Sequence, residues 1–248
     1  MIRRPPRTPA LLLAALMPLA AQAGIFETSS PDPSTRLKTE PQLGWKDDGS
    51  KTTWAMPSLS VDLPLRPGLH ANVSSGYGRV ESDGGDRARE GLADSKAGFK
   101  WRFYENRAAL SRLALGVEPK LGIPTADDGS GLGANCWKLA LPLLAAYEAG
   151  RLRLEGQLGY THAFGGQDDD ILLGALALVT VTPRLKLGGE IVEDSPADDI
   201  HRRQVRANLG LKYRLMRDLE LHGLAGRSID NHRGDTVEQA RMILQMLF

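Results

Sequence analysis

The chain has 248 residues, with 31 Lys and Arg against 30 Asp and Glu, and it contains one cysteine, Cys136. This charge balance gives no indication of nucleic-acid binding, and a single cysteine excludes an internal disulfide framework. After residue 23, the longest apolar run is residues 171–181, about half of the roughly 20 residues that a membrane-spanning helix needs.

The N-terminus has the three parts of a secretory signal peptide. Arginines at positions 3, 4 and 7 are followed by an apolar run over residues 10–20 and by the small-residue site Ala21-Gln22-Ala23. This pattern predicts a signal peptide over residues 1–23, with cleavage before Gly24, and the apolar run is too short for a membrane anchor. Without the three arginines, 28 basic residues face 30 acidic ones. We therefore expect an exported, nearly neutral protein.

Residues 136–164 form the clearest pattern in the chain. Apolar or aromatic residues occupy alternate positions from Trp137 to Tyr147 and, apart from a glycine, from Leu152 to Tyr160. Successive strand side chains point to opposite sides, so each half has one apolar face, and the turn at Ala149-Gly150 joins the halves. Each half has about the length of a tilted strand that crosses a bilayer, with aromatic residues near the strand ends. The stretch predicts a transmembrane hairpin.

Similar alternation recurs along the rest of the chain. It predicts ten more strands, the first of which has a weak pattern: Lys38–Lys46, Thr52–Leu65, Leu69–Val80, Ala93–Tyr104, Ala109–Ile123, Ile171–Val181, Leu185–Val192, Arg202–Arg214, Asp218–Arg227 and a terminal strand after Val237. With the hairpin, the total is twelve.

The connections alternate in length. Those after positions 65, 104, 148, 181 and 214 are short, whereas those after 80, 123, 164, 192 and 227 are longer and rich in Asp and Gly. Tight periplasmic turns and larger external loops are typical of an up-and-down antiparallel transmembrane β-barrel, whereas a soluble β-sandwich, the main alternative, needs long crossovers at irregular places. We predict an all-β barrel of twelve strands over residues 38–248, preceded by a periplasmic segment over residues 24–37.

The C-terminus favours the same architecture. The chain ends on Phe248, and apolar residues recur at alternate positions back to Ala240. This pattern resembles the signal that directs outer-membrane proteins to their assembly machinery. We therefore expect the bacterial outer membrane as the location, with membrane lipid, lipopolysaccharide and the barrel-assembly machinery as partners. Prolines at positions 57, 119 and 142 lie inside predicted strands, where they remove a ladder donor and predict bulges or bends.

Three central motifs carry a family resemblance. They are Lys100-Trp101-Arg102-Phe103, Glu118-Pro119-Lys120-Leu121-Gly122-Ile123-Pro124-Thr125, and Tyr147-Glu148-Ala149-Gly150 with Gly159-Tyr160-Thr161-His162. In these segments the chain resembles the outer-membrane family called the putative MetA-pathway of phenol degradation proteins. The resemblance implies a β-barrel channel, associated in some members with uptake of aromatic or poorly soluble compounds, and no catalytic residues. The chain departs from the pattern after Thr125, where Ala126-Asp127 replaces the more usual glycine.

If the apolar faces meet lipid, the opposite faces line the lumen. This register places eleven charged residues inside: Lys100, Arg102, Glu118, Lys120, Arg153, Glu155, Lys186, Glu190, Arg206, Lys212 and Glu220. Buried charges need partners or water. They either form ion pairs that fill a narrow barrel or line a passage that selects solutes. Both readings stay open, because eight strands are filled by side chains and sixteen leave a channel.

Residues 171–181 are apolar on both faces. Either register sends aliphatic side chains inward, for instance Leu172, Leu176 and Leu178. These side chains could pack against a segment folded into the barrel or form an apolar stripe for a hydrophobic solute.

The sequence offers weaker support for other chemistry. The five histidines are scattered, no serine lies in a nucleophile motif, and we expect no metal and no cofactor. The acidic runs at 168–170 and 198–199 are typical of solvated loops; the alternative is that they bind divalent ions that bridge lipopolysaccharide. We therefore expect a non-enzymatic channel for small, hydrophobic or aromatic solutes. The alternatives are an enzyme that modifies lipid or lipopolysaccharide and a closed structural barrel without transport.

Overall fold

The computed structural model describes residues 24–82, 88–127, 130–232, 234 and 236–248. The predicted signal peptide over residues 1–23 lies outside the described residues. Among those described, no helix has the length and apolar character to cross a membrane.

Strands account for almost all of the regular structure, with one 3-10 turn at Ile200–Arg202. The strand segments are β1 (Lys38–Asp47), β2 (Lys51–Arg66), β3 (Leu69–Ser82), β4 (Arg89–Leu92), β5 (Ser95–Arg107), β6 (Ser111–Val117), β7 (Lys120–Ile123), β8 (Lys138–Ala149), β9 (Leu152–Ala163), β10 (Asp170–Thr182), β11 (Leu185–Pro196), β12 (Gln204–Met216), β13 (Leu219–Asn231) and β14 (Glu238–Leu247). Because β4 and β5 both pair with β3, and β6 and β7 both lie between β5 and β8, these segments form twelve barrel strands.

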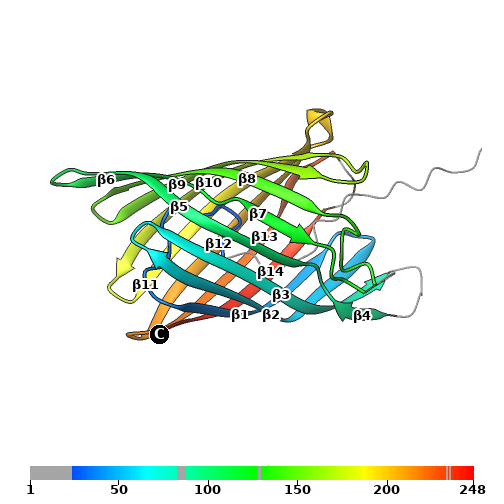
Figure 1. The fold of residues 1–248 in the computed structure, drawn as a ribbon, viewed down its shortest axis with the longest axis horizontal. Helices are drawn as coiled ribbons and strands as arrows, with labels where there is room; N and C mark the ends of the chain where they lie inside the picture. The colour runs from blue at the N-terminus through cyan, green and yellow to red at the C-terminus, as the bar shows by residue number, and fades with distance from the viewer. Residues whose placement is uncertain (1–23, 83–87, 128–129, 233, 235) are drawn as a thin grey trace, which may run out of the picture.

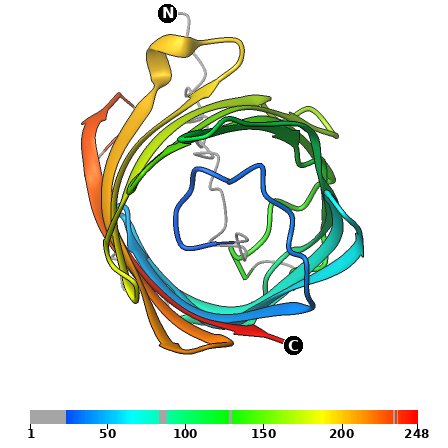
Figure 2. The ribbon, with the colours of Figure 1, turned by 90° about the vertical axis from the view of Figure 1, so that its left-hand side faces the viewer.

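The sheet closes into a barrel (Figures 1 and 2). Each strand pairs antiparallel with its neighbours in the chain, and β1 pairs with β14 in the register Lys38↔Leu247 to Asp47↔Glu238. Closure removes the unpaired edges that an open sheet would expose. The predicted fold class, the strand number and the weak first strand are thereby confirmed.

Short turns gather at one end of the barrel and long loops at the other (Figure 1). Two of the short turns contain a glycine with positive φ, Gly68 at 82° and Gly150 at 59°, which is the backbone region that glycine enters without steric cost. The predicted turn at residues 105–107 is wrong, because β5 continues to Arg107. The reason is that a register shift between Arg102 and Tyr104 turns Glu105 inward, where it forms ion pairs with Arg102 and Arg112.

The prolines inside strands lie at irregular positions of the ladder. The register of β2 against β3 shifts across Pro57, between Ala55 and Ser58. Pro119 separates β6 from β7, and Pro142 of β8 lies opposite this break. The Pro142 carbonyl still accepts a hydrogen bond of 3.2 Å from the Glu118 backbone N–H.

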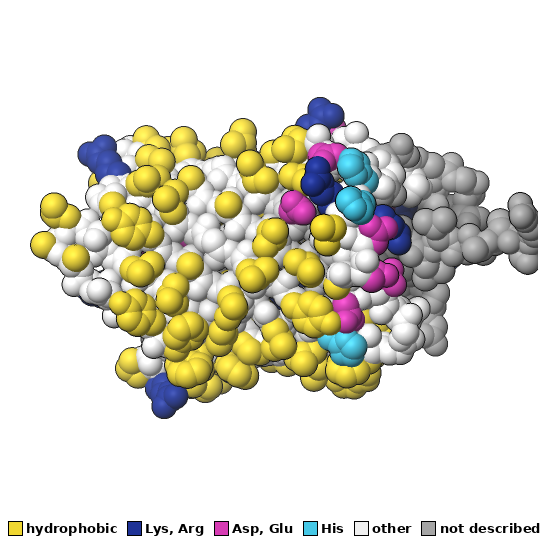
Figure 3. Space-filling model, turned by 90° about the horizontal axis from the view of Figure 1, so that it is seen from above, with side chains coloured by type: hydrophobic (Ala, Val, Ile, Leu, Met, Phe, Trp, Pro, Cys, Tyr) yellow, Lys and Arg dark blue, Asp and Glu magenta, His cyan; other side chains and the backbone are white. Residues whose placement is uncertain are grey.

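The outer face carries the apolar side chains (Figure 3). In this view they cover the barrel from the short-turn end to beyond its middle, while Asp, Glu and His side chains gather near the loop end. Exposed Leu63, Phe99, Leu158 and Leu209 belong to this belt. An apolar belt on a closed barrel faces lipid, because contact between apolar side chains and water is unfavourable.

Residues 24–37 lie inside the barrel, as the dark blue chain within the ring in Figure 2 shows. The sequence predicted a periplasmic segment here, whereas the structure buries Ile25 and Phe26 in the lumen. Their partners include Leu176 and Leu178 of β10, so the stretch that is apolar on both faces packs against an inward-folded segment. The full cluster is Ile25, Phe26, Leu176, Leu178, Leu224 and Ile243. The lumen therefore holds an apolar core built partly from the N-terminal segment.

Candidate functional site: the lumen and the inner segment

Residues 24–37, which we call the inner segment, contact one side of the barrel wall and then the other. Phe26 and Glu27 contact β11, β12 and β14, and Asp32 contacts β5, β6 and β9. The segment then reaches β3 through Ser34. These contacts are made by side chains and single backbone groups rather than by strand pairing. The segment thus occupies the lumen without adding a strand to the wall.

The Phe26 ring fills a hollow between β11 and β12. Gly188 and Gly210 face each other across the two strands, and a Cβ atom on either glycine would lie 2.8 Å from the ring. Only glycine leaves room for the ring at these two positions. The Lys212 Nζ atom lies 5.8 Å from the ring centroid, within the range of a cation–π contact.

The Glu27 carboxylate binds the wall next to this hollow. It accepts hydrogen bonds from Arg206 Nη2 at 2.6 Å, Asn208 Nδ2 at 3.2 Å and Gln239 Nε2 at 2.5 Å. Burial raises the pKa of the Glu27 carboxyl, but the charge and hydrogen bonds of Arg206 outweigh burial and hold the pKa well below its usual range. The group is therefore a carboxylate in a pocket of donors.

In the middle of the inner segment, Ser29 hydrogen-bonds to both an acidic and a basic side chain of the wall. The Ser29 hydroxyl donates to Glu118 Oε2 at 2.6 Å and accepts from Lys100 Nζ at 3.2 Å. Glu118 is fully buried and forms ion pairs with Lys100 at 3.5 Å and with Lys120 at 3.2 Å. The Ser29 backbone N–H donates to Gln157 Oε1 at 2.7 Å. Ser29 therefore takes part in the charge network that the wall already contains.

Asp32 is held by three arginines from three strands. Its carboxylate contacts Arg102 at 2.8 Å, Arg153 at 2.7 Å and Arg112. Burial raises the pKa of Asp32, but the hydrogen bonds from Arg112 and Arg153 lower it more, so the pKa lies well below the usual range. Carboxylate–guanidinium hydrogen bonds are among the stronger polar contacts in proteins. We call this cluster the arginine latch.

Four contacts anchor the segment at the short-turn end. The Ser34 backbone N–H donates to Nδ1 of the buried His70 at 2.8 Å. Arg36 forms an exposed ion pair with Asp218 and donates to the Phe248 carbonyl at 3.2 Å. The Phe248 N–H in turn donates to the Leu37 carbonyl at 2.9 Å. The segment therefore leaves the lumen at the seam between the first and last strands.

The structure brings most of the predicted lumen residues into contact with the inner segment. Lys100, Arg102, Glu118, Arg153, Glu190, Arg206 and Lys212 touch it directly, whereas Lys120 and Glu155 bind wall residues that do so. Glu220 pairs instead with Arg214 at 3.1 Å and contacts His222. Lys186 is exposed and lies opposite Lys212 in the ladder.

Sequence reasoning missed the segment's own side chains and several wall residues. Glu27, Ser29 and Asp32 lie in a polar, proline-containing stretch that has no strand pattern, so nothing local indicated that it folds inward. On the wall, Arg112 and His70 could have been found, because both take the inward position of a predicted strand. The double-sided apolar pattern of β10 was the one signal of an internal partner.

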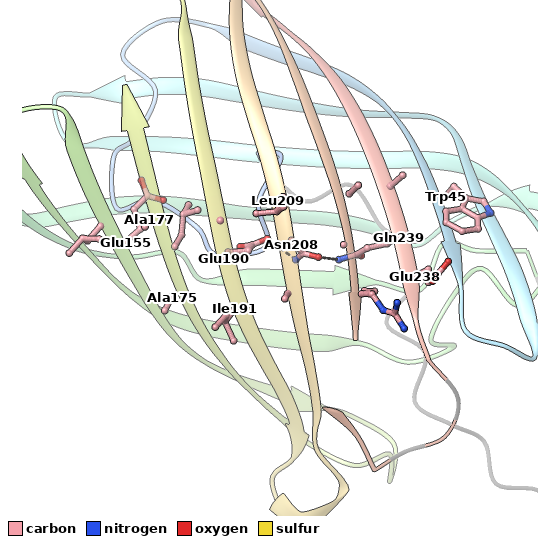
Figure 4. A pocket seen from close by; sticks show the side chains of 18 residues that line it. Trp45, Glu155, Ala175, Ala177, Glu190, Ile191, Asn208, Leu209, Glu238 and Gln239 are labelled. Atoms are coloured by element: carbon pink, nitrogen blue, oxygen red, sulfur yellow. Dashed lines mark hydrogen bonds between the residues drawn. The ribbon is translucent and has the colours of Figure 1, made fainter. Parts of the chain in front are cut away.

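A large hollow opens on the outside of the barrel (Figure 4). Its volume is about 980 Å³, and alternate outward residues of β9 to β14 line it, among them Ala175, Ala177, Ile191 and Leu209. The inward residues of the same strands, such as Glu190, are buried, so they contribute backbone to its floor. This hollow faces lipid and is separate from the lumen.

A second, smaller feature lies near the loop end. His162 Nδ1 is 2.9 Å from Asp169 Oδ1, and the Tyr160 hydroxyl donates to the same carboxylate. The Tyr160 bond, with further hydrogen bonds, lowers the pKa of Asp169 to about 2. Across the described part of the chain, no Ser, Thr or Cys side chain hydrogen-bonds to His162, and no group of three His, Cys, Asp or Glu is arranged to hold a metal ion.

Comparison with known proteins gives structural matches alone. No protein-family model and no curated protein matches the sequence. Among solved structures, the NanC porin is 9% identical, with a TM-score of 0.58 over 85% of this chain and 100% of that one. The KdgM porin in complex with disordered oligogalacturonate is 10% identical, with a TM-score of 0.54 over 85% and 99%.

A third solved structure matches over most of both chains. LpxR from Salmonella typhimurium is 9% identical, with a TM-score of 0.51 over 84% of this chain and 100% of that one. At these identities the matches show the fold and leave the activity open. Together with the closed wall and its apolar belt, they identify an outer-membrane β-barrel and locate the protein in the outer membrane.

Proposed function

We propose that the protein is an outer-membrane channel for small hydrophobic or aromatic solutes and that its inner segment holds it closed. The observation that carries the proposal is that the wall encloses a segment of the peptide chain (Figure 2), and the side chains of this segment contact the inner face of the wall. Eight-stranded barrels are filled by wall side chains alone. Here twelve strands leave room for a polypeptide, so departure of the segment would open a passage at least that wide.

Conductance across a planar bilayer tests this proposal. The full-length protein should give rare, small steps, whereas a variant that lacks residues 25–34 should give frequent, large and discrete steps. Silence of the deletion variant, despite the shift in gel mobility of a folded barrel on boiling, would favour a closed structural barrel instead.

An engineered disulfide between the inner segment and the wall provides the matched control, because it can be formed and reduced in the same variant. A Cβ placed on Gly174 would lie 3.3 Å from the Thr28 Cβ, close to the spacing within a disulfide. We therefore suggest Thr28→Cys with Gly174→Cys in a Cys136→Ser background. Oxidation should abolish the residual steps, and reduction should restore them. Equal conductance in both redox states would argue against closure by the segment.

The enzyme alternative rests on the His162–Asp169 pair. It predicts lipase or deacylase activity that His162→Ala abolishes while conductance stays unchanged.

A further inference from the structure

The inner face of β11, β12 and β14 has the features of a ligand site, and the inner segment occupies it. The ring hollow is built by the facing pair Gly188 and Gly210. Both glycines lie in central strand positions, where a missing side chain weakens a strand. Two such glycines in adjacent strands lower the stability of both strands. This loss is explained if the hollow binds an aromatic ring, and in this structure the ring is that of Phe26.

Polar groups surround the hollow in a fixed order. Arg206, Asn208, Gly210 and Lys212 take successive inward positions of β12. Lys212 lies over the ring, and Arg206 and Asn208 hold the carboxylate of Glu27. The strand therefore offers a cation for the ring, a gap for the ring itself, and donors for an anion, in that sequence.

Glu190 of β11 adds an acceptor for N–H groups. Its carboxylate accepts from the backbone N–H groups of Glu27 and Thr28, each at 2.9 Å, and from Asn208 Nδ2 at 2.9 Å. Glu190 is buried, so it needs such donors to offset desolvation. A ligand with a carboxylate alone would leave Glu190 with the Asn208 donor but without the two backbone donors of the segment, whereas an amide N–H beside the ring would replace a lost donor.

We propose that this face binds aromatic carboxylates that carry an amide N–H between ring and carboxylate, and that Phe26 and Glu27 are its built-in occupant. This inference rests on the proposed function, because the solute reaches the site when the segment leaves. The segment is tethered at Leu37, so it competes at an effective concentration of the order of millimolar. A solute of this class displaces the segment by taking over its ring, N–H and carboxylate contacts.

Calorimetric titration of the purified full-length protein in detergent tests the proposal, with phenylacetylglycine as the probe. The variant Phe26→Ala/Glu27→Ala, which we call the vacated variant, removes the ring and the carboxylate of the segment from the site while the arginine latch stays intact. It should bind the probe at least tenfold more tightly than the parent. Acetylglycine, which lacks the ring, and phenylacetamide, which lacks the carboxylate, should each bind at least tenfold more weakly than the probe.

Two glycine variants distinguish the site from general lipophilic binding. Added to the vacated variant, Gly210→Leu fills the hollow and should abolish binding of the probe. Gly156→Leu adds the same side chain on an outward position with no atom within 4 Å of its Cβ, and binding should persist. The proposal is overturned if Gly210→Leu binds as well as Gly156→Leu, or if the three probes bind equally. Because binding is measured without conductance, silence of the deletion variant in the bilayer would count against the channel alone.

Discussion

Residues 25–28 and residues 29–36 occupy the same lumen, but the wall holds them by different means. The front half inserts a ring and an aliphatic side chain into shaped apolar space, with the Glu27 carboxylate beside them. The rear half has no apolar side chain in this cluster and is held by the arginine latch and by His70. Shape fixes the position of the front half, and charge fixes that of the rear half.

The difference can be measured with one reporter cysteine in each half, in a Cys136→Ser background. Thr28→Cys reports on the front half and Pro33→Cys on the rear half, since both positions are buried. A bulky water-soluble maleimide reacts with either cysteine only when that half has left the wall. The labelling rate therefore follows the open population of each half.

Phe26→Ala should have the largest effect and should be confined to the front half. Truncation of a buried Phe typically costs about 3–5 kcal/mol, so front labelling should rise at least a hundredfold. Rear labelling should change less than threefold, because the latch is untouched. Leu158→Ala, on the lipid face, serves as the control. Equal acceleration at both reporters would show that the segment opens as one unit.

Asp32→Asn should release the rear half with a smaller effect. The Asp32 side chain is 25% exposed, so we expect about 2 kcal/mol, near the range for a hydrogen bond to a charged group. Rear labelling should then rise roughly 30-fold while front labelling stays nearly constant. A rear rate that does not change would mean that His70 and the short-turn anchor suffice to hold this half.

Acid should leave the latch closed over the range in which an ordinary carboxylate titrates. The arginines depress the folded-state pKa of Asp32, so its stabilisation is present above the usual Asp pKa and is lost only as pH falls through the depressed value. The frequency of conductance steps should therefore be the same at pH 7 and pH 4. Opening midway between these values would show that another group controls the latch.

Arg36→Gln should have the smallest effect. Its ion pair with Asp218 is exposed on both sides, and such pairs contribute about 0–1 kcal/mol. Labelling at either reporter should change less than fivefold. A larger change would indicate that the seam at Phe248 controls the segment.

The strands of the barrel wall could be predicted from the sequence because the patterns that determine them lie within each strand and turn. Alternation fixes which side of each strand meets lipid, and the turn lengths fix the connectivity, so Leu154 and Arg153 were placed on opposite faces without a structure. The course of β5 through Arg107 was missed because charged residues resemble a turn until their partners are known. Its continuation depends on Arg112, from the next strand.

The inner segment could not be predicted because its contacts are long-range. Glu27 and Arg206 are 179 positions apart, as is typical of its partners, and no pattern within residues 24–37 encodes them. The residue pair Gly188 and Gly210 could be recognised as a hollow only once the register of β11 and β12 was known. The apolar inward face of β10 indicated a partner but not which one.

The junction of Leu37 and Phe248 has a mechanical consequence. A force applied at the Gly24 end pulls the inner segment away from the wall one contact after another, so Phe26, Asp32 and Ser34 each resist in turn. Past Leu37, the same force runs along β1 and loads the ladder of β1 and β14 in shear, where all its hydrogen bonds resist together. The inner segment, whose contacts break one by one, is thus joined directly to β1, whose hydrogen bonds break only together. A force large enough to pull the segment out of the lumen therefore leaves the barrel closed.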